Sequence, residues 1–250
     1  MVHFDLSGKT VLITGASSGL GQHFARLLGS AGAQVVATAR RIEPLQSLSR
    51  EICAQGGQCA FRSLDVTDEQ EVAECFDAHG NIDILVNCAG IVSDGPVIDQ
   101  ESANWDQVID TNLRSLFLTS RAFARMAKAQ NRGGAIVNIA SILGLRQAGN
   151  VAAYAVSKAG VIQFTKVLAL EFARLGIRVN ALAPGYFETQ LNRQFFESEA
   201  GKKLIGRIPS RRLGKPEELD GAFLLLCSDA ASYITGSVLT VDGGHSVNSL

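Results

Sequence analysis

Short runs of apolar, mostly β-branched residues alternate with amphipathic stretches along the whole chain. Seven of these runs are predicted strands, at residues 11–14, 34–38, 60–66, 82–87, 135–140, 178–183 and 238–241. Because the runs are apolar throughout rather than at every second position, they predict a parallel sheet that is covered on both faces. The amphipathic stretches between them complete the pattern of a doubly wound α/β domain with seven parallel strands and helices on both faces.

The predicted helices differ in length and in the signals that mark their ends. The first reaches about Ala31, Pro44 suits the opening of the second, and Asp68 is the predicted N-cap of a third at residues 69–79. Two longer helices are predicted at residues 105–129 and 154–175. The stretch from 184 to 215 carries no strand pattern, and a segment this long in a compact domain is typical of a lid or binding loop. We therefore expect one domain spanning 1–250, with a substrate lid at about 185–215.

Composition narrows the function classes. The 250 residues hold 23 Lys plus Arg against 24 Asp plus Glu, and a formal net charge of −1 does not favour nucleic acid or an anionic membrane as partner. The five cysteines show no C-x-x-C spacing, which predicts reduced thiols in a cytoplasmic protein. No secretory signal and no apolar run near the length of a membrane span is present. The four histidines are scattered without ligand spacing, so we expect surface or terminal residues and no metal site.

The turn after the first predicted strand has the sequence TGASSGLG, at residues 14–21. Glycines allow a sharp turn in which backbone amides approach a pyrophosphate at a helix N-terminus. The alternative interpretation is a tight turn that only allows the following helix to pack closely, without a ligand. At the end of the second strand, an acidic residue would select NAD by binding the ribose 2′-hydroxyl. Arg40 and Arg41 stand there instead and favour a 2′-phosphate, hence NADP, although a solvated arginine pair would look the same.

Tyr154 and Lys158 are four residues apart on a predicted helix, so their side chains share one face. A cation within about 4–6 Å favours a phenolate and would lower the pKa of the tyrosine toward neutrality. This pair predicts an acid/base residue, although an exposed amphipathic turn carries the same spacing by chance.

Taken together, these motifs resemble the short-chain dehydrogenase/reductase family, in its short single-domain branch of 3-oxoacyl reductase-like enzymes with a Rossmann-like fold. The resemblance runs from about Leu6 to Gly244. The matching motifs are residues 14–21, Asp65-Val66, Asn87-Cys88-Ala89-Gly90, Asn112, Ser141, Tyr154, Lys158, Pro184-Gly185 and Thr189. Cys88 departs from the family's second asparagine, a position that braces the sheet.

The resemblance implies a catalytic tetrad of Asn112, Ser141, Tyr154 and Lys158. Tyr154 would exchange a proton with the substrate oxygen, and Ser141 would hydrogen-bond that oxygen. Lys158 would hold the cofactor ribose and lower the pKa of Tyr154. Asn112, through its backbone carbonyl in a distorted helix turn, would hold a water that relays protons to Lys158. The implied cofactor-binding residues are Gly15, Ser17, Ser18, Gly19, Leu20, Gly21, Arg40, Asp65, Val66, Asn87, Ala89, Gly90, Tyr154, Lys158, Pro184, Gly185, Phe187 and Thr189.

The expected activity is an NADP(H)-preferring ketoreductase that interconverts a ketone and a secondary alcohol, with NAD(H) still possible. The lid offers apolar groups for an apolar or 3-oxoacyl-type substrate; the substrate residues are Val92, Leu143, Tyr186, Leu191 and Phe195, with Phe196, Leu204 and Ile205 nearby. A carrier protein, a CoA ester and a free ketone remain open as substrates. Arg132 occupies one carrier-binding position of the family, but the second holds Leu175, with Arg174 one place away.

Two other functions remain as alternatives, an NAD-linked polyol or hydroxysteroid dehydrogenase and a non-catalytic dinucleotide sensor. We also expect assembly. The helices at 105–129 and 154–175 carry more apolar residues than one sheet-facing stripe needs, and in the family such helices pair across two-fold axes. A homotetramer is expected, with a dimer as the alternative.

Overall fold

The computed structural model describes residues 4–188 and 193–247. Its strands are β1 (Thr10–Thr14), β2 (Gln34–Ala39), β3 (Gln58–Ser63), β4 (Ile84–Asn87), β5 (Gly134–Ile139), β6 (Ile177–Pro184) and β7 (Val238–Val241). They form one sheet in the order β3-β2-β1-β4-β5-β6-β7, and every neighbouring pair is parallel. The doubly wound, seven-stranded prediction is confirmed.

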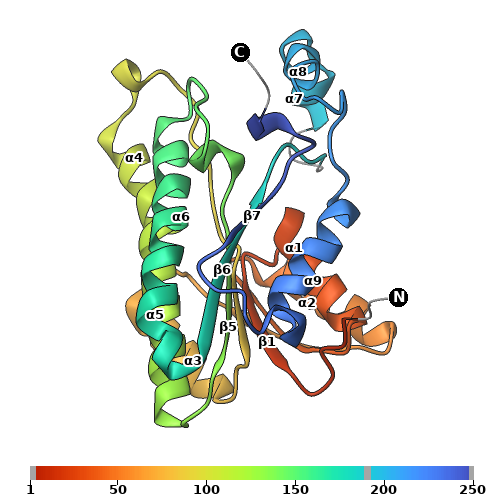
Figure 1. Ribbon diagram of the computed structural model, residues 1–250, viewed down its shortest axis with the longest axis vertical. Helices are drawn as coiled ribbons and strands as arrows, with labels where there is room; N and C mark the ends of the chain where they lie inside the picture. The colour runs from red at the N-terminus through yellow and green to blue at the C-terminus, as the bar shows by residue number, and fades with distance from the viewer. Residues whose placement is uncertain (1–3, 189–192, 248–250) are drawn as a thin grey trace.

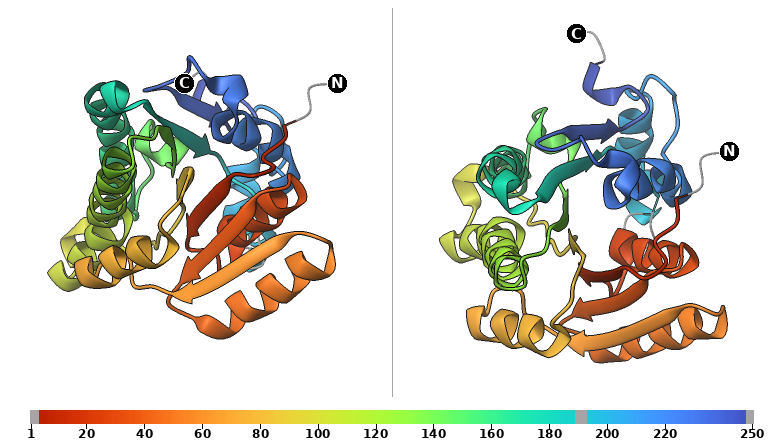
Figure 2. Two further views of the ribbon diagram at one scale, coloured as in Figure 1. Left: turned by 90° about the horizontal axis from the view of Figure 1, so that it is seen from below. Right: turned by 60° about the horizontal axis from the view of Figure 1, so that its bottom comes forward.

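The helices form a layer on each face of the sheet (Figures 1 and 2). They are α1 (Gly19–Ser30), α2 (Ile42–Ala54), α3 (Glu69–His79), α4 (Ser102–Ile109), α5 (Ser115–Ala129), α6 (Ala152–Phe172), α7 (Arg193–Glu197), α8 (Glu199–Ile205) and α9 (Asp220–Cys227). One layer contains α1, α2 and α9, where the rings of Phe24 and Phe223 stack with centroids 4.0 Å apart. The other contains α3, α5 and α6, which bury Phe76, Phe123 and Leu168 against the sheet.

The strand order places a topological switch between β1 and β4. The chain moves outward from β1 to β3, then returns to the other side of β1 and moves outward again from β4 to β7. The loops after β1 and β4 therefore diverge at the carboxyl edge of the sheet, which is where open α/β sheets bind ligands. Within the described residues, no helix is long and apolar enough to span a bilayer, and no group of metal-ligating side chains gathers.

Several boundaries differ from the prediction. Strand β3 spans Gln58–Ser63 rather than 60–66, because residues 64–66 leave the sheet and enter the loop at its carboxyl edge. The predicted helix at 105–129 is interrupted by a π-helical turn at Asp110–Arg114, which separates α4 from α5. Pro44 is the third residue of α2, still within the first turn, where backbone N–H groups lack helical partners. The predicted lid contains α7 and α8 rather than an irregular loop.

Candidate active site

A cleft of about 1180 Å³ opens at the carboxyl edge of the sheet, at the switch between β1 and β4. Its walls come from the glycine-rich turn after β1, the end of β2, the loops after β3, β4, β5 and β6, and helices α4, α6 and α7. Segments far apart in the sequence thus surround one space, and this space contains most of the predicted site.

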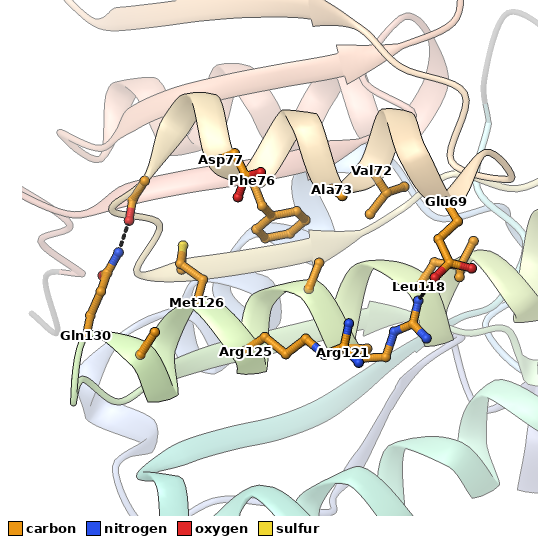
Figure 3. A pocket seen from close by; sticks show the side chains of 13 residues that line it. Glu69, Val72, Ala73, Phe76, Asp77, Leu118, Arg121, Arg125, Met126 and Gln130 are labelled. Carbon is orange, nitrogen blue, oxygen red and sulfur yellow. Dashed lines mark hydrogen bonds and ion pairs between the residues drawn. The ribbon is translucent and has the colours of Figure 1, made fainter.

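A smaller groove of about 510 Å³ lies on the outer surface between α3 and α5 (Figure 3). Phe76, Leu118 and Met126 contribute to its apolar lining. Arg121 pairs with Glu69 at one end, and Gln130 donates to the Gly80 carbonyl at the other. None of the predicted site residues lines this groove, so the chemistry belongs to the larger cleft.

The glycine-rich turn fits a dinucleotide phosphate. Gly15 and Gly19 have φ values of 70° and 56°, in the left-handed region that favours glycine. A Cβ on Gly21 would lie 2.3 Å from the Gly15 carbonyl oxygen, so α1 approaches the turn too closely for a side chain. A Cβ on Gly19 would meet open space, which leaves the first turn of α1 accessible to a ligand. Backbone N–H groups and the helix N-terminus are suited to bind an anionic pyrophosphate there.

Both arginines at the end of β2 line the cleft. The Arg41 guanidinium donates to the hydroxyl oxygens of Ser17 and Ser18, at 3.2 and 3.3 Å, and so joins the end of β2 to the glycine-rich turn. Arg40 acts on Asp65: burial would raise the pKa of this carboxyl, but hydrogen bonds from Thr67 and the charge of Arg40 hold it below its ordinary value. Arg41 was not among the predicted cofactor residues, although its adjacency to Arg40 was a signal.

Tyr154, on the first turn of α6, lines the cleft together with Ser141 and interacts with its hydroxyl. Ser141 follows β5 and also caps the short turn after it, its Oγ accepting from the Leu143 amide at 3.1 Å. Burial raises the pKa of Tyr154, and the hydrogen bond from Ser141 only partly opposes this. The phenol therefore carries its proton at neutral pH.

Lys158 is buried one helical turn further along α6. Its Nζ donates to the Ile139 carbonyl at 2.8 Å and lies 5.6 Å from the centroid of the Tyr154 ring. Burial lowers the pKa of Lys158 to about 8. Burial rather than Lys158 dominates the pKa of Tyr154 in this structure, and the lowering of that pKa by Lys158 together with a bound nicotinamide stays a prediction.

Asn112 lies in the π-helical turn and is fully buried rather than exposed in the cleft. Its amide side chain accepts from the Ile91 amide and donates to the Ile91 carbonyl, both at 2.8 Å. It also donates to the Ser157 hydroxyl at 3.0 Å. Asn112 thus fixes the loop after β4 against the catalytic turn of α6. The glycine at 90 leaves room for both neighbours, since a Cβ there would lie 3.4 Å from Asn112 Oδ1 and 3.5 Å from Lys158 Nζ.

The predicted substrate residues give one end of the cleft an apolar lining. Val92, Leu143, Tyr186 and Phe195 all line it. Phe196 joins them from α7, with its ring centroid 6.0 Å from Tyr186 and 5.2 Å from Phe195. His245, expected to be a surface or terminal residue, packs its ring against Tyr186 at 5.5 Å.

Some predicted residues do not reach the cleft. Asn87 is buried in the sheet, where it donates to Asn138 Oδ1 at 2.9 Å, so it supports β4 rather than a ligand. Phe187 is also buried, with its ring against Gly214. The lid residues Leu204 and Ile205 do not line the cleft. Thr189 and Leu191 fall outside the described residues.

Arg132, the candidate carrier-protein contact, lies at the amino end of β5, opposite the cleft. Its guanidinium forms an ion pair with Asp83 and donates a hydrogen bond to Asn81 Oδ1 at 3.4 Å. Cys88, by contrast, lines the cleft, and burial raises the pKa of its thiol to about 12. Asp106 and Asp110 also line it from α4 and the π-helical turn; no motif marked these two positions.

Known proteins resemble this chain over nearly its full length. Residues 15–246 match the family model described as enoyl-(acyl carrier protein) reductase. The 3-oxoacyl-[acyl-carrier-protein] reductase FabG of Thermotoga maritima is 41% identical over 96% of this chain and 98% of its own length. The 2-dehydro-3-deoxy-D-gluconate 5-dehydrogenase of Dickeya dadantii is 38% identical over 96% of both chains. A structure of a putative 2-deoxy-D-gluconate 3-dehydrogenase from Agrobacterium tumefaciens with bound NADP is 41% identical, covers 99% of this chain and 100% of its own, and superposes with a TM-score of 0.93.

Proposed function

Since this chain belongs to the short-chain dehydrogenase/reductase family of oxidoreductases, which act on CH–OH and C=O groups with a nicotinamide dinucleotide, we propose that it is an NADP(H)-preferring ketoreductase. The observation that carries the proposal is the meeting of Tyr154, Ser141 and Lys158 in one cleft with the glycine-rich turn and two arginines. The domain spans 1–250 in this proposal, and the segment at 185–215 covers the substrate.

The nicotinamide would supply or accept the hydride, which no side chain can do. The glycine-rich turn and the first turn of α1 would hold the pyrophosphate, and Asp65, Val66, Ala89 and Gly90 line the path from there toward Tyr154. Pro184 and Gly185 form the opposite wall.

Tyr154 donates its phenolic proton to the carbonyl oxygen during reduction and accepts it back during alcohol oxidation. The raised pKa suits the donor role, because the phenol stays protonated at neutral pH. Ser141, which lies beside the phenol in the cleft, would orient the same oxygen. Lys158 would bind the ribose and replace the proton, and Asn112 would position the backbone that faces both.

The two arginines support the preference for NADP. Arg41 contacts both serines of the turn that would hold the neighbouring phosphates, and Arg40 lines the same cleft beside Asp65. Loss of a charge-assisted contact typically costs about 1.5–3 kcal/mol, or roughly tenfold to a hundredfold in affinity. Arg40→Ala and Arg41→Ala should each raise the Michaelis constant for NADPH by that factor and spare NADH. A parent enzyme that already prefers NADH would contradict the proposal.

The apolar end of the cleft supports a 3-oxoacyl-type or other apolar carbonyl substrate. The ion pair of Arg132 with Asp83 removes one argument for a carrier protein, so a CoA ester or free ketone fits equally. A polyol-type dehydrogenase is the second candidate, since several similar proteins are named as dehydrogenases of gluconate derivatives. Screening ketones, 3-oxoacyl thioesters and keto-sugar acids by the loss of reduced-nicotinamide absorbance tests this choice. Turnover of sugar acids alone would favour the second candidate.

We further propose a homotetramer in a reducing, cytoplasmic location. On α6, Val156, Val167 and Leu170 are exposed, the last by 80%, and Phe117 is exposed on α5. A helix that is apolar on its outer face is usually covered there. The five cysteines are all free, which suits a compartment that keeps thiols reduced. Light scattering should give four times the chain mass, and a stable monomer at micromolar concentration would refute the assembly.

A further inference from the structure

A group of basic side chains lies behind the apolar end of the cleft. Arg146 follows the turn after β5, and His245 opens the C-terminal turn after β7; these segments lie at the same end of the molecule as α7 and α8 (Figure 1). The Arg146 guanidinium donates to the His245 carbonyl, and the His245 ring packs on Tyr186, which lines the cleft. Two segments 99 residues apart thus meet behind one wall residue.

Several charged side chains act on His245. Arg207 also acts on His245: burial lowers the pKa of the imidazole, and the charges of Arg146 and Arg207 lower it further. Asp242 is the opposing group, but its two carboxylate oxygens accept the backbone amides of Gly244 and Ser246, at 2.9 and 2.6 Å. A neutral imidazole therefore stands beside two guanidiniums and one carboxylate that already has backbone partners.

Two polar side chains here have unused hydrogen-bonding capacity. His245 Nδ1 is buried and has no hydrogen-bond partner within the described residues, which is rare for a buried polar atom. The Arg146 guanidinium carries five N–H donors and donates to the His245 carbonyl. An oxygen-rich anion would accept from Arg146 and, with the imidazole proton on Nδ1, from His245.

This group is close to the reacting end of the site. The charge of Arg146 lowers the pKa of the Tyr186 phenol against the effect of burial, and Tyr186 in turn acts on Tyr154. One aromatic side chain thus separates the basic group from the catalytic phenol. A substrate whose carbonyl meets Tyr154 needs only a short chain to bring a second functional group beside Tyr186.

We propose that Arg146 and His245 bind an anionic oxygen group, a carboxylate or a phosphate, carried by the substrate. This proposal rests on the proposed function, because it concerns the end of the substrate that lies away from the carbonyl group to be reduced. The proposed substrate class is a short keto acid, or a ketone carrying a phosphate, with an apolar middle that contacts Tyr186 and Phe195.

Matched ketones test the proposal. We would compare 4-oxopentanoate, its neutral methyl ester and the isosteric 3-oxobutylphosphonate, using parent, Arg146→Gln, Arg146→Lys and the exposed control Arg50→Gln. The readout is the ratio of kcat/KM for the acid to kcat/KM for the ester, so that a loss of activity common to both substrates cancels. The parent should prefer an anion, and Arg146→Gln should lower the ratio about tenfold to a hundredfold through KM. Arg146→Lys should restore part of it, and Arg50→Gln should match the parent.

Preference for the phosphonate over the carboxylate would identify a phosphate as the natural group. Equal use of acid and ester by the parent would overturn the proposal. An Arg146→Gln variant that loses both substrates equally would also overturn it, because Arg146 would then only hold His245 in place. Calorimetric titration of acid and ester into Tyr154→Phe enzyme separates this inference from the proposed function. If this variant binds the acid selectively and the parent enzyme turns over no ketone, the anion site is supported and the proposed ketoreductase activity is refuted.

Discussion

Replacing Lys158 by methionine should make the protein more stable at neutral pH. Burial lowers the pKa of Lys158 from an ordinary value of 10.5 to about 8. Because each pH unit corresponds to about 1.4 kcal/mol, holding this cation costs the fold about 3 kcal/mol at pH 7. Methionine is unbranched and fills similar space. It leaves the Ile139 carbonyl without its hydrogen-bond donor, which costs about 1 kcal/mol of stability. We expect a net gain of about 2 kcal/mol in the free energy of unfolding.

The gain should depend on pH in a defined direction. Below pH 8, folded and unfolded chains both hold the proton, so the full cost of the buried charge is present. Between pH 8 and 10.5 the folded chain releases its proton first, and the stability of the parent rises relative to the variant. The advantage of Lys158→Met should therefore fall by about 2–3 kcal/mol between pH 7 and pH 10, to near zero.

Urea unfolding of both proteins at one fixed concentration measures this difference, since any subunit dissociation contributes to apparent stability. Lys166→Met, on an exposed position of the same helix, is the matched control and should change stability by less than about 0.5 kcal/mol at every pH. A Lys158→Met protein that is less stable than the parent at pH 7, by an amount constant with pH, would show that the fold favours the charged lysine and would refute the reasoning.

Three further changes have defined outcomes. Tyr154→Phe should lower turnover by at least about a hundredfold while NADPH fluorescence still reports binding, since only the phenolic hydroxyl is lost; near-normal turnover would refute the acid/base role. Gly21→Ala places a Cβ against the Gly15 carbonyl and should cost about 1–3 kcal/mol and weaken NADPH binding, whereas Gly221→Ala, where a Cβ meets open space, should do neither. Asp68→Ala removes an acceptor for two amides at the start of α3 and should cost about 1 kcal/mol in thermal or urea unfolding without changing kcat.

The fold was predictable because the central strands are buried on both faces. In β1, β4 and β5 nearly every residue is buried, so continuous apolar runs mark them, and the sheet order follows from parallel crossovers. The boundary of β3 was not predictable, because Leu64 and Val66 lie beyond the strand, in a loop, and are still buried in the core that packs on the sheet. Burial alone cannot tell these two environments apart. The distorted helix turn at Asn112 was predicted from the family resemblance alone, and the structure has a π-helical turn there; the apolar pattern could not indicate it, since its residues continue the helical pattern on both sides.

The catalytic end was predictable from motifs because its geometry is local. Tyr154 and Lys158 are joined by one helical turn, and the glycine-rich turn forms within eight residues. The substrate end depends on contacts between distant segments, such as Arg146 with His245, and no spacing in the sequence records them. The protonation of Tyr154 also could not be inferred from its neighbour Lys158, because burial changes the charge that each residue can carry.

Helix α6 connects the proposed assembly to the proposed chemistry. Tyr154 and Lys158 face the cleft from its first turns, while Val156 lies between them in sequence and is half exposed on the outer side. Further along, Val167 and Leu170 continue the exposed apolar surface, and the inner side packs on the sheet. A partner subunit covering Val156 would restrain the same turn that holds the phenol and the buried cation. Because that turn already carries the cost of burying Lys158, contacts on its outer side would stabilise it without altering the groups that face the substrate.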